Sequence, residues 1–80
     1  MKTIKVGAGV YEIYQTIKGR ELVFLIEQDD DEWVYESFDV DKDGAYSTLD
    51  EGEYRGCTST KKEAVRQIEE LDQQGKGEEE

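Results

Sequence analysis

One segment of this sequence has helical periodicity, and it lies near the C-terminal end. Thr60 and Glu63 are spaced as a capping box, in which each side chain bonds the backbone amide of the other residue. Apolar residues then recur at intervals of three or four positions and predict one stripe along a helix: Ala64, Val65, Ile68 and Leu71. We expect this helix to end at Gly75 and residues 75–80 to form a flexible acidic tail. With one such stripe, the helix is expected to cover a single face of a sheet.

Strand-like patterns precede the helix. They are rich in β-branched, aromatic and aliphatic side chains and are separated by turn signals. Three segments have this pattern: residues 10–17, 21–27 and 33–38. A short fourth strand is expected near residues 45–46 or 54–55. Residues 47–53 are polar and interrupted by glycine, and no element is assigned to them.

The order of these elements defines the expected fold. Gly7-Ala8-Gly9 is interpreted as a bulge or bend, with Ile4 and Val6 beginning the strand that continues after it. We therefore expect an α+β fold, an antiparallel β-meander of three or four strands with one C-terminal helix packed on one face. A chain of 80 residues has room for one small core, and residues 1–74 are expected to form a single domain.

The charge of the chain is strongly negative and is concentrated in its central third. The sequence contains 21 acidic and 10 basic residues, which gives a formal net charge of −11. Residues 27–53 hold twelve acidic residues and one basic residue, so this segment alone also carries −11. Such a concentration predicts a one-sided electrostatic field, which attracts basic partners and repels the phosphates of nucleic acids.

Missing residue types limit the chemistry that the chain can perform. There is no histidine and a single cysteine, Cys57, so neither a Ser-His or Cys-His pair nor a zinc finger can be built. Gly7-Ala8-Gly9 lacks the third glycine and the Gly-Lys-Ser/Thr ending of a phosphate-binding loop. A glycosidase-type pair of carboxylates needs a deep cleft, which a chain of this length rarely forms. We expect a protein that is not an enzyme and that carries no cofactor.

Residues 39–50 match the beginning of an EF-hand-type calcium loop. Gly44 would supply its sharp turn, and aspartates occupy its first, third, fifth and twelfth positions: Asp39, Asp41, Asp43 and Asp50. The flanking segments do not have helical patterns, and the sequence has no second loop of this kind. We favour a plain turn over Asp41–Gly44 that closes a hairpin. A calcium-binding module is the alternative interpretation.

This chain combines small size, strong acidity and the absence of catalytic groups with short strands and a following helix. The helix begins Thr-Lys-Lys-Glu-Ala-Val-Arg-Gln-Ile. In this combination the chain resembles small phage-encoded inhibitors, namely anti-CRISPR proteins and DNA mimics such as the uracil-DNA glycosylase inhibitor. The resemblance lies in size, charge and layout, and it assigns no roles to individual residues. It implies a protein that presents carboxylates where phosphates would otherwise bind.

We therefore expect a non-enzymatic acidic protein that binds the basic surface of a nucleic-acid-binding protein or complex and inhibits it. Direct contact with nucleic acid or a membrane is not expected. The expected contact residues lie on two turns and the strand between them: Asp29, Asp30, Asp31, Glu32, Glu36, Asp39, Asp41 and Asp43. A contact that uses both turns would run along that strand. Besides the calcium module, a generic small adaptor domain is an alternative.

The sequence also indicates the cell compartment in which the protein is expected. Cys57 has no second cysteine with which to form an internal disulfide, which agrees with a reducing compartment. No apolar run approaches the length needed to cross a bilayer. We expect a cytoplasmic protein, which for a phage-encoded chain means the cytoplasm of the host.

Overall fold

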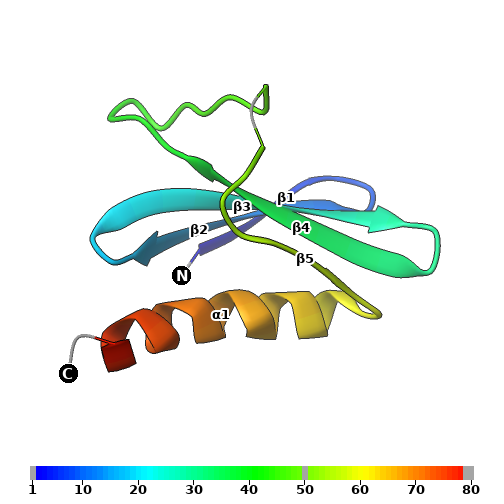
Figure 1. The fold of residues 1–80 in the computed structure, drawn as a ribbon. Helices are drawn as coiled ribbons and strands as arrows, with labels where there is room; N and C mark the ends of the chain where they lie inside the picture. Colours follow the sequence, from blue (N-terminus) through cyan, green and yellow to red (C-terminus); the bar gives the residue numbers. More distant parts are fainter. Residues whose placement is uncertain (1, 50, 79–80) are drawn as a thin grey trace.

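The computed structural model describes residues 2–49 and 51–78, with side chains as far as residue 71. Strands precede a single helix (Figure 1): β1 (Lys2–Gly7), β2 (Val10–Ile17), β3 (Arg20–Asp29), β4 (Glu32–Asp39), β5 (Arg55–Thr58) and α1 (Lys61–Glu78). The strands form one antiparallel sheet whose spatial order, β1-β2-β3-β4-β5, is the order of the chain. The predicted α+β meander with a C-terminal helix is confirmed.

The sheet contains five strands, one more than the upper limit of the prediction. The difference arises at Gly7-Ala8-Gly9, which reverses the chain instead of bending one strand. Gly7 pairs with Val10, and Gly9 has a φ of +70°, a left-handed conformation that glycine adopts without steric cost. A register shift between Lys5 and Gly7 shows that a bulge is also present, next to the turn. The last strand, β5, begins at Arg55, within the second of the two positions expected for a short strand.

The hydrophobic core lies between α1 and one face of the sheet. Alternate residues of β2, β3 and β4 point into it, and Ala64 and Ile68 of the predicted helical stripe are fully buried against them. Val65 and Leu71, the other two residues of the stripe, pack at its margin. The core cluster consists of Ile13, Ile17, Leu22, Phe24, Ile26, Tyr35, Ala64 and Ile68. The helix therefore covers one face of the sheet, as predicted from its single stripe.

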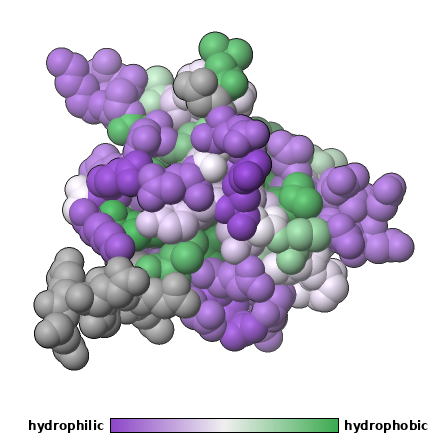
Figure 2. All heavy atoms as spheres, viewed as in Figure 1, coloured by the Kyte–Doolittle hydropathy of each residue, from purple (hydrophilic) through white to green (hydrophobic). Residues whose placement is uncertain are grey.

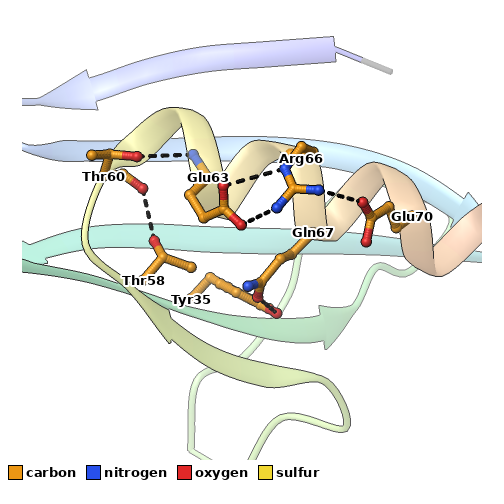
Figure 3. Close-up of polar contacts among 7 residues, drawn as sticks. All are labelled: Tyr35, Thr58, Thr60, Glu63, Arg66, Gln67 and Glu70. Carbon is orange, nitrogen blue, oxygen red and sulfur yellow. Dashed lines mark hydrogen bonds and ion pairs between the residues drawn. The ribbon is translucent and has the colours of Figure 1, made fainter.

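The first turn of α1 contains half of the predicted capping box (Figure 3). The Glu63 amide donates a hydrogen bond of 3.1 Å to the Thr60 hydroxyl, as expected of an N-cap. The Glu63 carboxylate pairs with Arg66 rather than returning to the Thr60 amide, and Arg66 also reaches Glu70 at 2.8 Å. An arginine one turn along the helix is a stronger partner for a carboxylate than a neutral amide.

The C-terminal end of α1 differs from the expectation. The helix extends to Glu78, beyond Gly75, where we expected it to end and an acidic tail to begin. Each of the two glycines of this segment, Gly75 and Gly77, costs a helix about 1 kcal/mol, and the glutamines and lysine around them are good helix formers. Residues 79 and 80 of the expected tail lie outside the described residues.

The face of the sheet opposite α1, here called the outer face, is covered at one end by residues 40–49 and 51–54, here called the 40–54 loop (Figure 1). In Figure 1 this loop arches from the end of β4 over the side of the sheet away from α1. The Tyr46 ring stacks on Phe38 of β4 with 5.9 Å between ring centroids, and its hydroxyl donates a hydrogen bond to Glu12 of β2. Val23 of β3 lies between these strands and is fully buried. The loop therefore forms a third layer over part of the sheet.

Candidate protein-binding surface

Four of the predicted contact residues gather at the turn between β3 and β4, and together they are called the acidic turn: Asp29, Asp30, Asp31 and Glu32. Asp29 pairs with Glu32 across the hairpin, so Asp30 and Asp31 form a two-residue connection. Asp30 has a φ of +55°, a conformation that aspartate tolerates better than most residues. All four side chains are exposed. Asp30 and Asp31 make no hydrogen bond or ion pair within the part of the chain that the structure describes.

The other predicted contact residues lie away from the acidic turn, and three of them have partners within the fold. Glu36 accepts a hydrogen bond of 2.5 Å from the Gly52 amide. Asp39 forms an ion pair of 2.7 Å with Arg20. Asp41 accepts hydrogen bonds of 2.9 Å from two backbone amides of its own turn. These carboxylates stabilise the 40–54 loop. Asp39 and Asp41 lie at or beyond the end of β4 opposite the acidic turn, and Glu36 lies on β4 between its two ends.

Arg20 joins the two ends of the 40–54 loop to the sheet. Its guanidinium lies 2.7 Å from Asp39 at the end of β4 and 2.7 Å from Glu53 near the start of β5. The hydrogen bonds to these carboxylates raise the pKa of Arg20 above its already high ordinary value. Ser37 and Tyr54 add a reciprocal pair of bonds, since the amide of each donates to an oxygen of the other. The loop is therefore fixed to the sheet at both ends.

The predicted turn over Asp41–Gly44 forms, but it does not close a β-hairpin. The Gly44 amide donates a bond of 3.0 Å to the Asp41 carbonyl, and Gly44 has a φ of +85°. No strand follows in residues 45–49, which corrects our expectation of a hairpin. The chain instead leaves the turn to place Tyr46 on the outer face, where its ring and hydroxyl find partners.

The candidate calcium ligands do not converge among the described residues. Asp39 is directed to Arg20, and Asp41 is bound to the amides of its own turn. Within residues 2–49 and 51–71, no three Asp, Glu, Cys or His side chains are grouped so that they could hold a metal ion. Asp50, the ligand expected at the twelfth position, lies outside the described residues.

Cys57 of β5 lies beside the acidic turn. Its thiol is exposed and lies 3.0 Å from a Glu32 carboxylate oxygen. This hydrogen bond, with smaller contributions from desolvation and from the charges of Glu32 and Asp29, raises the pKa of Cys57. A raised pKa keeps the thiol protonated and therefore less nucleophilic near neutral pH.

Sequence reasoning missed the division of the outer face into a covered and an open part. Val23 pairs with Phe38, on which Tyr46 stacks, and is fully buried, whereas Leu25 and Val34, further along the same strands, are only partly buried. In β2 and β4 a glutamate stands between two apolar residues at a spacing of two, Val10-Glu12-Tyr14 and Val34-Glu36-Phe38, which is a pattern visible in the sequence. Hydrophilic side chains dominate the view in Figure 2.

Comparisons of this chain with protein-family models, with curated proteins and with solved structures found no match. Among the described residues, no helix combines the length and the apolar character required to cross a membrane.

Proposed function

We propose that this chain is a non-enzymatic acidic protein that binds the basic surface of a nucleic-acid-binding protein or complex and inhibits it, in the manner of anti-CRISPR proteins and DNA mimics. The cell compartment that we propose for this activity is the cytoplasm. The observation that carries the proposal is the exposed acidic turn, which has no arginine or lysine partner among the described residues.

The ion pairs of the described residues lie away from the acidic turn, so they do not neutralise its negative charge. Arg20 is shared by two carboxylates at the opposite end of the sheet, and Arg66 is shared by two carboxylates on α1. Arg55 lies 3.9 Å from Glu51. Each arginine that forms an ion pair in the described part of the chain therefore has its partners elsewhere, and the acidic turn contributes an uncompensated field.

The chemistry of the turn also supports a phosphate-like role. Its four carboxylates lie on consecutive exposed residues, so the turn is a locally dense source of negative charge, as a nucleic-acid backbone is. Exposed carboxylates accept hydrogen bonds from the same lysine and arginine side chains that bind phosphates. Each pair at the rim contributes only about 0.2–1 kcal/mol, so the combined field should act mainly on association rate and salt dependence.

The test compares capture of partners by the wild-type chain and by a turn variant with Asp29, Asp30 and Asp31 changed to asparagine. Asparagine removes the charge and tolerates the left-handed backbone at position 30. The bait is incubated with nuclease-treated bacterial lysate, and bound proteins are identified by mass spectrometry. We expect nucleic-acid-binding proteins to be recovered by the wild type and depleted about tenfold or more with the turn variant.

A control variant carries the same change in charge at exposed positions away from the turn: Glu21→Gln, Glu51→Gln and Glu69→Gln. We expect it to capture the same partners as the wild type. Equal recovery by the turn variant and the wild type would contradict the proposal. Recovery of proteins with no affinity for nucleic acid would instead favour a generic adaptor domain.

A further inference from the structure

The open part of the outer face has a regular pattern of acidic and apolar side chains. Residues opposite one another on antiparallel strands share a face, so the register defines two neighbouring rows across the sheet. One row contains Glu12, Leu25, Glu36 and Arg55, and the next contains Val10, Glu27, Val34 and Cys57. Glutamate and an apolar residue therefore alternate across β2, β3 and β4, and the two rows are out of phase.

A shallow groove of about 280 Å³ runs through the centre of this pattern. Leu25 and Val34 lie diagonally across it and provide apolar surface, while Glu27 and Glu36 occupy the other diagonal. Diagonal neighbours of this kind are about 7–8 Å apart, and their Cβ atoms are somewhat closer. That separation leaves room for one planar cation between two carboxylates.

The carboxylates of Glu27 and Glu36 differ in the hydrogen bonds that they form. Glu27 is exposed and forms no hydrogen bond or ion pair with the described residues. Glu36 uses one oxygen to accept a hydrogen bond from the Gly52 amide, and its other oxygen accepts none from the described residues. Arg55 lines the groove, but its ion pair is with Glu51. The groove therefore keeps an unbalanced negative charge above an apolar floor.

We propose that this groove receives an arginine side chain of the partner protein. The inference rests on the proposed function and specifies the contact that would accompany the acidic turn, which lies at the end of the same two strands. The methylene stem of an arginine matches the surface of Leu25 and Val34, and its guanidinium matches the space between Glu27 and Glu36. A phosphate group would instead be repelled by both carboxylates.

The test uses a hexa-arginine peptide as the probe, with a hexa-lysine peptide of equal charge as a control for diffuse attraction. Binding is followed by NMR on the isotope-labelled full chain at moderate salt. We expect the signals of Leu25 and Val34 to shift saturably, with tighter binding of hexa-arginine because its planar fork suits paired carboxylates.

Two charge-reversal variants distinguish binding in the groove from attraction by the overall negative charge of the protein. Glu27→Lys and Glu69→Lys change the net charge equally, and both side chains are exposed without a partner among the described residues. We expect Glu27→Lys to weaken hexa-arginine binding about fivefold more than Glu69→Lys does. Unchanged melting temperatures would verify that both variants are folded.

The outcomes separate this inference from the proposed function. NMR shifts confined to the acidic turn, together with equal weakening of hexa-arginine binding by Glu27→Lys and Glu69→Lys, would contradict arginine binding in the groove. The proposed function would not be affected by that result. Equal affinity for hexa-arginine and hexa-lysine, or the absence of saturable binding, would also overturn the groove. The capture experiment with the turn variant decides the proposed function independently.

Discussion

At the scale of single residues, Gly52 allows the 40–54 loop to approach β4 closely. A methyl group at this position would overlap the backbone carbonyl oxygen of Ser37 and the Glu36 side chain. At Gly7, by contrast, a methyl group would meet no heavy atom within 4 Å, and the backbone is not left-handed. The two glycines therefore provide a matched pair for testing how tightly the loop is held.

We expect Gly52→Ala to lower the free energy of unfolding by about 1–3 kcal/mol, because backbone atoms must move to relieve the overlap. Gly7→Ala should change it by no more than about 0.5 kcal/mol. Urea denaturation followed by tryptophan fluorescence measures both values. Equal stabilities of the two variants would contradict the close approach of the loop to β4.

Tyr46 gives the loop a dependence on alkaline pH. Burial, together with the hydrogen bond to Glu12, raises the pKa of Tyr46 from about 10 to about 12. The unfolded chain releases this proton near pH 10 and the folded chain retains it until about pH 12. The stabilisation by the protonated phenol is therefore complete below pH 10 and is lost as the pH rises through 12.

Spectrophotometric titration of the tyrosinates checks this assignment. The difference between the wild-type curve and that of Tyr46→Phe isolates one phenol, and we expect its midpoint near pH 12. A difference curve centred near pH 10 would show that Tyr46 is not bound to Glu12 in solution.

At the scale of elements, α1 provides the only helical cover of the core within the described residues. Ile68 is fully buried against the sheet, whereas its neighbour Glu69 is exposed. We expect Ile68→Ala to destabilise the fold by about 2–5 kcal/mol, and Glu69→Ala to change the stability by less than about 0.5 kcal/mol. Thermal unfolding by circular dichroism distinguishes the two. A small effect of Ile68→Ala would contradict the docking of α1 on the sheet.

The elements that sequence patterns predicted well are those whose signals are local. The apolar stripe of α1 and the strands from residue 10 to residue 38 follow from periodicity and turn residues. The 40–54 loop could not be predicted in this way, because its position depends on Tyr46, Gly52 and Tyr54 finding partners in β2 and β4. The Gly7–Gly9 segment was misread because its glycines are compatible with both a bulge and a turn.

At the scale of the whole molecule, the sequence located the acidic residues but not their partners. Asp39 and Arg20 are separated by 19 positions, and Glu53 and Arg20 by 33, so no local pattern reveals that they form ion pairs. Only the structure distinguishes the carboxylates that stabilise the loop from those that remain exposed at the acidic turn. This distinction reduces the expected contact surface to the turn and the neighbouring open part of the outer face.

We propose that the acidic turn binds a surface where nucleic acid would otherwise bind, and a displacement assay measures this competition. A fluorescent DNA or RNA ligand is bound to the nucleic-acid-binding protein recovered in the capture experiment, and the chain is added while anisotropy is measured. We expect the wild type to release the nucleic acid and the turn variant with three asparagines to require about tenfold more protein for the same release. A complex in which the chain and the nucleic acid are bound together, or equal displacement by the turn variant, would contradict it.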